Sequence, residues 1–200
     1  DGKIPEAFLW LAFALFVDGV DGTLARAVNV KQNTPEIDGA ILDNIIDYLN
    51  YVVVPVFIFY SLGMAPEPYL LLSCVAILLV SCFTFTNTNI KTDDFYFSGF
   101  PAIWNIVVLY FYILESSEFT NFIFVILFCV LTFIPFKYVH PFRVVEFRKI
   151  TLIITCIWMI TTTILLFDVS SDPVFISANF VIWLITNIYF AGNILFRSIK

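Results

Sequence analysis

Charged residues are scarce in this chain. Only 13% of its 200 residues are Asp, Glu, Lys or Arg, whereas 60% are hydrophobic and 24 are Phe. The mean hydropathy is +0.94. A soluble domain of this size has too little interior to bury so much apolar surface. The composition therefore excludes a soluble globular protein and predicts an all-α, polytopic transmembrane helix bundle.

Cysteine and histidine are also too few, and too scattered, for a zinc site or a disulfide framework. The chain has four cysteines, all in apolar stretches and none at metal-ligand spacing: Cys74, Cys82, Cys129 and Cys156. We interpret them as small buried hydrophobic residues. The only histidine, His140, lies beside Pro141 in a basic loop, where a surface residue is more common than a catalytic one.

Seven apolar stretches predict seven membrane spans. They are residues 7–28, 39–62, 69–90, 100–114, 119–139, 150–167 and 174–196. Most have the roughly 20 residues that a spanning helix needs, but 100–114 is short. Connections are short, and no linker or internal repeat is visible, so we expect one membrane domain over residues 1–200. Because the chain starts without Met, we expect an eighth helix upstream.

Lys and Arg are missing from every second loop between these spans. Nine of the ten basic residues lie on one side, with Lys3 the exception. The loops on the opposite side hold no Lys or Arg and carry Glu67, Glu115, Glu118, Asp168 and Asp172. By the positive-inside rule the basic side, with the 29–38 connection, is cytoplasmic. We therefore expect an integral membrane protein whose functional site faces the cytoplasm.

Four aspartates interrupt the first two spans: Asp18, Asp21, Asp43 and Asp47. A carboxylate at membrane depth costs roughly 2.5–3.5 kcal/mol on insertion scales. The first pair shares one helix face, and the second pair, at i and i+4, shares another. A connection of about ten residues makes the two helices antiparallel neighbours, so the acidic faces can meet at the cytoplasmic side.

Carboxylates brought together in this way repel one another unless cations lie between them. Oxygen ligands select hard ions such as Mg²⁺ or Mn²⁺, and two such ions about 3.5–4 Å apart can clamp a diphosphate. Gly22, Ala25 and Gly39 keep the two faces slim, which leaves room for a nucleotide, and Arg26 can bind phosphate. A structural salt-bridge network is the alternative, but Arg26 alone cannot neutralise four carboxylates.

The pattern resembles the signature of the CDP-alcohol phosphatidyltransferases, D-x2-D-G-x2-A-R-x8–9-G-x3-D-x3-D. Every fixed position is present between Asp18 and Asp47, but twelve residues rather than eight or nine separate Arg26 from Gly39. The longer gap is similar to that of the bacterial phosphatidylcholine synthase branch. Residues 93–105 and 138–143 add to this resemblance.

The resemblance implies transfer of the phosphatidyl group from CDP-diacylglycerol to choline, with release of CMP. It implies that Asp18, Asp21 and Asp43 bind two Mn²⁺ or Mg²⁺ ions, and that Asp47 is both a ligand and the general base. The residues that it places at the CDP moiety are Asp21, Gly22, Ala25, Arg26 and Gly39.

Choline is a permanent cation that aromatic faces and a carboxylate can bind. The predicted cytoplasmic loop 91–105 offers Asp93, Tyr96 and Trp104 for this purpose, although aromatic residues also gather at membrane interfaces without binding a ligand. Arg143 is a candidate for the donor phosphates or a lipid head group. Equally, the basic residues around it can serve only to set topology and attract anionic lipids.

Two other functions remain open from the residues alone. The same chemistry could use serine, inositol phosphate or glycerol phosphate as the acceptor. A cation transporter would instead place its carboxylates near the bilayer midplane on broken helices, often in repeated halves. We expect residues 150–196 to act as scaffold, as the wall of a lipid groove or as a contact with a second copy. Nothing in the pattern indicates a nucleic-acid partner.

Overall fold

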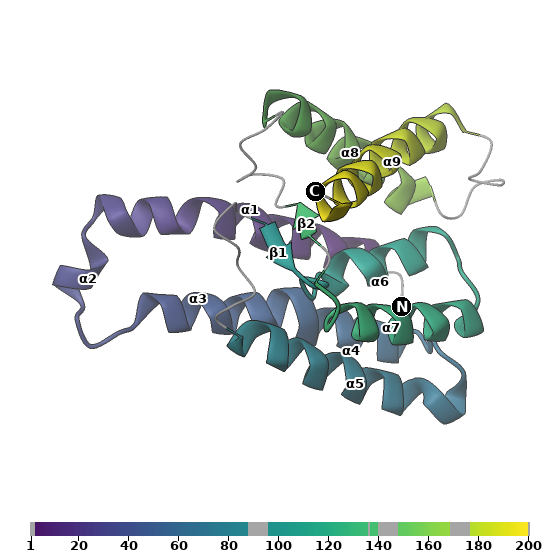
Figure 1. The fold of residues 1–200 in the computed structure, drawn as a ribbon, viewed down its shortest axis with the longest axis horizontal. Helices are drawn as coiled ribbons and strands as arrows, with labels where there is room; N and C mark the ends of the chain where they lie inside the picture. Colours follow the sequence, from purple (N-terminus) through teal and green to yellow (C-terminus); the bar gives the residue numbers. More distant parts are fainter. Residues whose placement is uncertain (1–2, 88–95, 136, 140–147, 169–176, 200) are drawn as a thin grey trace. The chain divides into compact units, whose positions relative to one another are not determined.

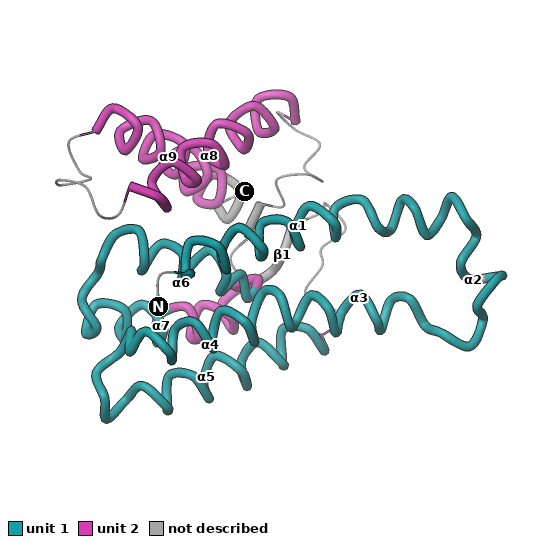
Figure 2. Tube along the Cα trace, turned by 180° about the vertical axis from the view of Figure 1, so that it is seen from behind, with its two compact units in different colours: residues 1–86, 102–127 teal, residues 87–101, 128–200 magenta. Residues whose placement is uncertain are grey.

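The structure is a computed structural model that describes residues 3–87, 96–135, 137–139, 148–168 and 177–199 (Figure 1). The regular elements of this part of the chain are helices and two three-residue strands. The chain forms two compact units (Figure 2), unit 1 with residues 1–86 and 102–127 and unit 2 with residues 87–101 and 128–200.

Unit 1 contains the first two predicted spans and the site. Its elements are α1 (Ile4–Ala27), α2 (Val30–Asn33), α3 (Gly39–Tyr48), η1 (Leu49–Val53), α4 (Val54–Ser61), α5 (Glu67–Thr86), α6 (Trp104–Ile113) and most of α7 (Glu118–Leu131). The segments α3, η1 and α4 form one continuous helix over Gly39–Ser61, in which η1 is a π-helical turn. Side chains from four of these elements fill the interior: Val52, Phe59, Ile77, Trp104 and Val108.

Unit 2 contains a small two-stranded sheet and a helix pair. Strand β1 (Tyr96–Ser98) pairs antiparallel with β2 (Lys137–Val139), with Phe97 opposite Tyr138. After β1 the chain turns at Gly99, whose φ is +86° and where an added Cβ would lie 2.3 Å from the Thr132 carbonyl oxygen, so only glycine fits. Helices α8 (Arg148–Asp168) and α9 (Ala178–Ile199) pack against each other.

All seven predicted spans contain a helix, and five helices are long and apolar enough to cross a membrane. The prediction of a helix over 119–139 was wrong in length, because α7 ends at Leu131. The Phe100 amide donates to the Leu131 carbonyl at 3.2 Å, and Pro135 follows four residues later, where a helix cannot easily continue. The short span at 100–114 is confirmed as short, since α6 has 10 residues.

All four cysteines are free thiols, as predicted. The prediction that all of them are buried was wrong for Cys82 and Cys156, which are exposed on α5 and α8. Both lie on outward faces of apolar helices, where a membrane protein meets lipid. Large apolar side chains are exposed on such faces elsewhere as well, for example Trp10 at 70% and Phe16 at 65%.

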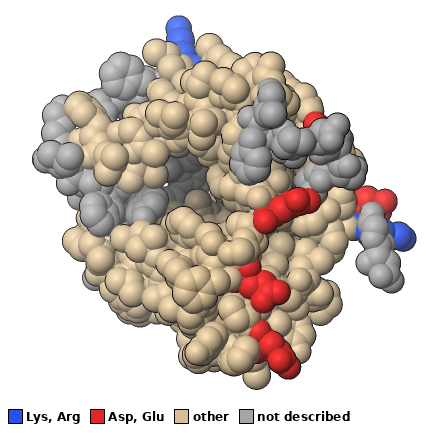
Figure 3. Space-filling model, turned by 90° about the vertical axis from the view of Figure 1, so that its right-hand side faces the viewer, with Lys and Arg blue, Asp and Glu red and all other residues tan. Residues whose placement is uncertain are grey.

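Acidic side chains gather at one end of unit 1. The start of α1 and the α4–α5 and α6–α7 turns lie at this end (Figures 1 and 2), and Glu6, Glu67 and Glu118 occupy the first turns of α1, α5 and α7. Figure 3 looks onto this face and shows acidic groups in a row. The α2 connection lies at the opposite end of the same unit, next to Arg26. The two ends of unit 1 thus differ in charge, one acidic and the other next to Arg26, in the same direction as the predicted loops.

Candidate active site

The site lies between α1 and α3, the two helices that the α2 connection joins. Asp18 and Asp21 come from α1, and Asp43 comes from α3. Each of the three can place a carboxylate oxygen within 4.8 Å of the other two. The structure therefore brings together three of the four predicted aspartates, from two different helices. Asp18 and Asp21 are half-buried, and Asp43 is exposed.

Local hydrogen bonds determine where α3 begins and thus where Asp43 lies. The Asp38 side chain is the N-cap of α3 and accepts hydrogen bonds from the amides of Ala40 (2.9 Å) and Ile41 (3.3 Å). At the end of α1, Asn29 adopts a left-handed conformation with φ 50°, and the Asn33 amide side chain donates to the Val28 carbonyl at 2.7 Å. These caps reverse the chain through α2, so that the two acidic faces meet.

Asp47 lies one turn beyond Asp43 and is not in the three-carboxylate group. Its environment differs from that of Asp43, because the residue is half-buried and its Oδ1 atom is inaccessible to solvent. The two aspartates of α3 therefore lie in different environments, Asp43 exposed and Asp47 half-buried.

Arg26 and Gly22 form a second part of the site. Arg26 is exposed, and its Nη2 donates to Thr23 Oγ1 at 3.1 Å. An added Cβ on Gly22 would lie 3.3 Å from Arg26 Nη1, so this glycine leaves space along which the guanidinium lies. Gly39 has nothing within 4 Å of an added Cβ and borders open space. Ala25, between them in the motif, is half-buried.

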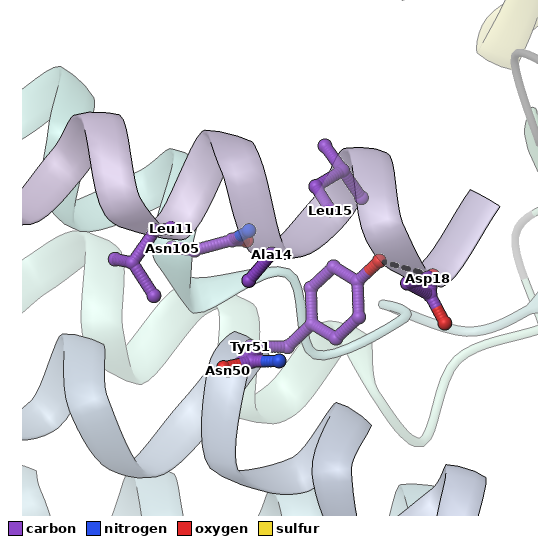
Figure 4. Close-up of a pocket in the computed structure, with 7 residues that line it drawn as sticks. All are labelled: Leu11, Ala14, Leu15, Asp18, Asn50, Tyr51 and Asn105. Atoms are coloured by element: carbon purple, nitrogen blue, oxygen red, sulfur yellow. Dashed lines mark hydrogen bonds between the residues drawn. The ribbon is translucent and has the colours of Figure 1, made fainter. Parts of the chain in front are cut away.

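Tyr51 is a residue of the site that the sequence analysis did not identify. It comes from η1, and its hydroxyl donates to Asp18 Oδ2 at 3.3 Å. The two side chains line a small pocket with Asn50, Asn105 and three apolar residues of α1: Leu11, Ala14 and Leu15 (Figure 4). The sequence did contain a sign that Tyr51 belongs to the site, since it follows Asp47 by four residues and precedes Pro55 by four.

Among the remaining predicted site residues, Trp104 has a described side chain, and it does not join this group. Trp104 is fully buried inside unit 1, and its indole Nε1 donates to Ser81 Oγ at 2.8 Å. Because no face of this indole is open, its position argues against a role in a choline cage. Tyr96 lies in β1, but its side chain is outside the description. Asp93, Arg143 and His140 lie outside the described residues.

The comparison with known protein families decides the class of this site. Residues 1–134, which include all four aspartates, match the family described as CDP-alcohol phosphatidyltransferase. The chain belongs to this family. The membership confirms the resemblance seen in the motif and sets the transporter alternative aside. This CDP-alcohol phosphatidyltransferase is therefore an integral membrane enzyme that transfers phosphatidyl groups.

Curated relatives of this phosphatidyltransferase carry one name. The phosphatidylcholine synthase of Pseudomonas aeruginosa is 40% identical over 201 residues, covering 100% of this chain and 83% of that protein. The phosphatidylcholine synthase of Rhizobium meliloti is 42% identical, with 79% of this chain and 66% of the relative aligned. That of Legionella pneumophila is 47% identical, over 74% of this chain and 60% of the relative. The chain thus spans less than two thirds of the last two proteins.

The donor set fits the divalent metal on which this family generally depends. Three carboxylates with oxygens mutually within 4.8 Å can converge on one hard cation. The choice between Mn²⁺ and Mg²⁺ does not follow from oxygen donors alone, because both ions accept them.

Proposed function

We propose that this chain is a phosphatidylcholine synthase, which transfers the phosphatidyl group of CDP-diacylglycerol to choline and releases CMP. The convergence of Asp18, Asp21 and Asp43 supports the chemistry. The names of relatives that are 40–47% identical support choline as the acceptor. We place the enzyme in the bacterial cytoplasmic membrane with the α2 end of unit 1 facing the cytoplasm, because nine of the ten basic residues lie in the loops and the terminus predicted on that side.

In this proposal Asp18, Asp21 and Asp43 bind the divalent ion, and Asp47 contributes to a second ion. When bound, the metal neutralises negative charge on the diphosphate and on the departing CMP. The three carboxylates supply the negative charge that retains the cation, and α1 and α3 hold them at fixed separations. The half-buried position of Asp18 and Asp21 limits the competition from water.

Arg26 and the two glycines bind and orient the nucleotide part of the donor. The guanidinium can donate two parallel hydrogen bonds to a phosphate, and it is exposed at the end of α1. Gly22 leaves the space in which it lies, and Gly39 borders open space wide enough for part of a ligand. Asp21 and Ala25 complete this CDP-binding face.

Asp47 is the general base. Its carboxylate accepts the hydroxyl proton of choline while the choline oxygen forms a bond to the β-phosphorus, which carries the diacylglycerol. The bond from that phosphorus to the bridging oxygen breaks, and CMP leaves with the electron pair. Asp47 lies one helical turn beyond Asp43 on the same helix and is half-buried, which supports a position beside the metal ligands. Alignment of these groups, rather than covalent catalysis, accounts for most of the rate.

The deciding experiment measures CMP release by the purified full-length protein. The assay contains CDP-diacylglycerol, Mn²⁺ and one of choline, serine, inositol, inositol phosphate or glycerol 3-phosphate. We expect release with choline and none above background with the others. Release with a different acceptor would retain the aspartate chemistry and reject choline. No release with any acceptor, from protein that elutes as a single folded species, would contradict the proposed reaction.

A further inference from the structure

Tyr51 lies in a part of its helix that is not regular α-helix. Within the continuous helix Gly39–Ser61, the turn Leu49–Val53 is π-helical, and the Val54 amide donates to the Leu49 carbonyl five residues earlier. π-helical turns inside α-helices are rare and are often found at functional sites. The turn begins two residues after Asp47, and Tyr51 lies at its centre.

Pro55 accounts for the position of the π-helical turn. It lies in the first turn of α4 and is fully buried. Proline has no amide hydrogen, so it cannot donate to the carbonyl of Tyr51 four residues earlier, and its ring crowds that carbonyl. The helix winds more widely instead. Tyr51 lies within this turn, and its hydroxyl reaches Asp18 of α1.

The Tyr51 hydroxyl then crosses from this helix to α1. It is half-buried and donates to Asp18 Oδ2 at 3.3 Å. The direction of the bond follows from the chemistry, since an ionised carboxylate only accepts hydrogen bonds. A donor on one oxygen fixes the rotation of the carboxylate about its Cβ–Cγ bond. Groups that hydrogen-bond to a metal-binding carboxylate without touching the metal orient that carboxylate and contribute to metal affinity.

We infer that Tyr51 is a positioning residue, whose hydroxyl holds the Asp18 carboxylate in the orientation in which it binds the divalent ion. The inference rests on the proposed metal role of Asp18. It assigns the π-helical turn a function, which is to present the Tyr51 hydroxyl to Asp18.

Tyr48 provides a matched control on the same helix. Its hydroxyl also makes one hydrogen bond, but to the Leu78 carbonyl of α5 at 2.9 Å and not to an aspartate. Tyr48→Phe and Tyr51→Phe therefore each remove one hydroxyl and one hydrogen bond, three residues apart. A purely structural role would give the two variants similar behaviour.

The test measures Mn²⁺ binding to the full-length protein in detergent and without substrate. The EPR signal of free Mn²⁺ reports how much of the ion is bound. We expect Tyr51→Phe to raise the Kd about tenfold, the low end of the range for the loss of such a hydrogen-bonding group, because 3.3 Å is long for this bond. Tyr48→Phe should bind like the unmodified protein. At saturating Mn²⁺ the kcat of Tyr51→Phe should recover to within about twofold, since the ligands themselves are intact.

The variant Asp18→Asn distinguishes a failure of the positioning role of Tyr51 from a failure of the proposed metal site. If Asp18→Asn loses Mn²⁺ binding while Tyr51→Phe binds normally, the positioning role is wrong and the proposed metal site stands. If Asp18→Asn also binds normally, the metal role of Asp18 and the positioning role are both wrong. Should Tyr51→Phe fail to fold, Pro55→Ala retains the hydroxyl but permits α-helical winding. That variant is expected to weaken Mn²⁺ binding, and unchanged binding would contradict the inference.

Discussion

Both units place polar side chains on apolar helices, but they do so in opposite ways. In unit 2 the polar groups between α8 and α9 are neutral and bond to each other. Trp183 Nε1 donates to Thr162 Oγ1 at 3.1 Å, and the Thr151 and Tyr189 hydroxyls are 2.8 Å apart. In unit 1 the polar groups between α1 and α3 are carboxylates of the same sign, gathered within 4.8 Å.

The difference distinguishes structural from functional polarity in a membrane protein. Neutral groups that satisfy each other within lipid contribute modestly to helix association, by about 0.6 kcal/mol per interhelical hydrogen bond. Like charges held together destabilise the fold unless a cation binds. Substitutions in unit 2 should therefore change stability, and substitutions in the acidic cluster should change metal binding and rate.

The largest expected effect is that of Asp47→Asn. Loss of the general base should lower kcat with choline by about 100- to 10,000-fold, because the amide cannot accept the proton. The affinity for CDP-diacylglycerol should change little, since Arg26 and the glycines bind the nucleotide. Steady-state CMP release and a binding measurement with the donor alone check both parts. A kcat within twofold of normal would remove Asp47 as the base.

Gly22→Ala should raise the KM for CDP-diacylglycerol several-fold. The new Cβ would lie 3.3 Å from Arg26 Nη1 and displace the guanidinium by a few tenths of an ångström. The same change should raise stability by up to about 1 kcal/mol, because alanine is the better helix former. Gly19→Ala is the control, since nothing lies within 4 Å of an added Cβ there. If both variants had the same KM, the proposed position of Arg26 would be incorrect.

Asp43→Asn should make the metal-free protein slightly more stable. It removes one of three like charges from the cluster, and at an exposed position this repulsion is worth about 1 kcal/mol. The gain in Tm on adding Mn²⁺ should shrink in the same variant. Thermal unfolding with and without Mn²⁺ measures both quantities. A metal-free protein that became clearly less stable would indicate that the cluster is structural.

Thr162→Val should have the smallest effect on the site and should change stability in the opposite direction to Asp43→Asn. It removes the acceptor of the buried Trp183 indole in unit 2 and should lower stability by about 1 kcal/mol. The kcat and the Mn²⁺ affinity should remain unchanged. A loss of activity in folded Thr162→Val protein would show that the two units do not divide the roles in this way.

Much of the fold and most of the acidic site were predictable from local signals. Hydropathy indicates each helix, and the i, i+3, i+4 spacing places the aspartates on faces that a short connection brings together. The end of α7 was not predictable from hydropathy, because Phe133 and Ile134 continue the apolar run beyond Leu131. A contact from Phe100, distant in the sequence, accompanies the end of that helix.

The aromatic residues were the least predictable part. In a chain with 24 Phe, no local pattern distinguishes a buried ring such as Trp104 from one that faces a ligand. Tyr51 went unnoticed for a related reason: it follows Asp47 at helical spacing, but it is one of nine Tyr in the chain and no local pattern distinguishes it from the others. Pro55 was the visible sign of the π-helical turn, but proline is tolerated in membrane helices for several reasons.

The most direct test of the central claim is the Mn²⁺ affinity of Asp18→Asn, Asp21→Asn and Asp43→Asn, each compared with Asp38→Asn. Asp38 is a nearby exposed aspartate that caps α3, and asparagine caps a helix equally well. The account predicts that each of the first three variants loses Mn²⁺ affinity and that Asp38→Asn retains it. Equal Mn²⁺ binding by all four variants would contradict a metal site at the meeting point of α1 and α3.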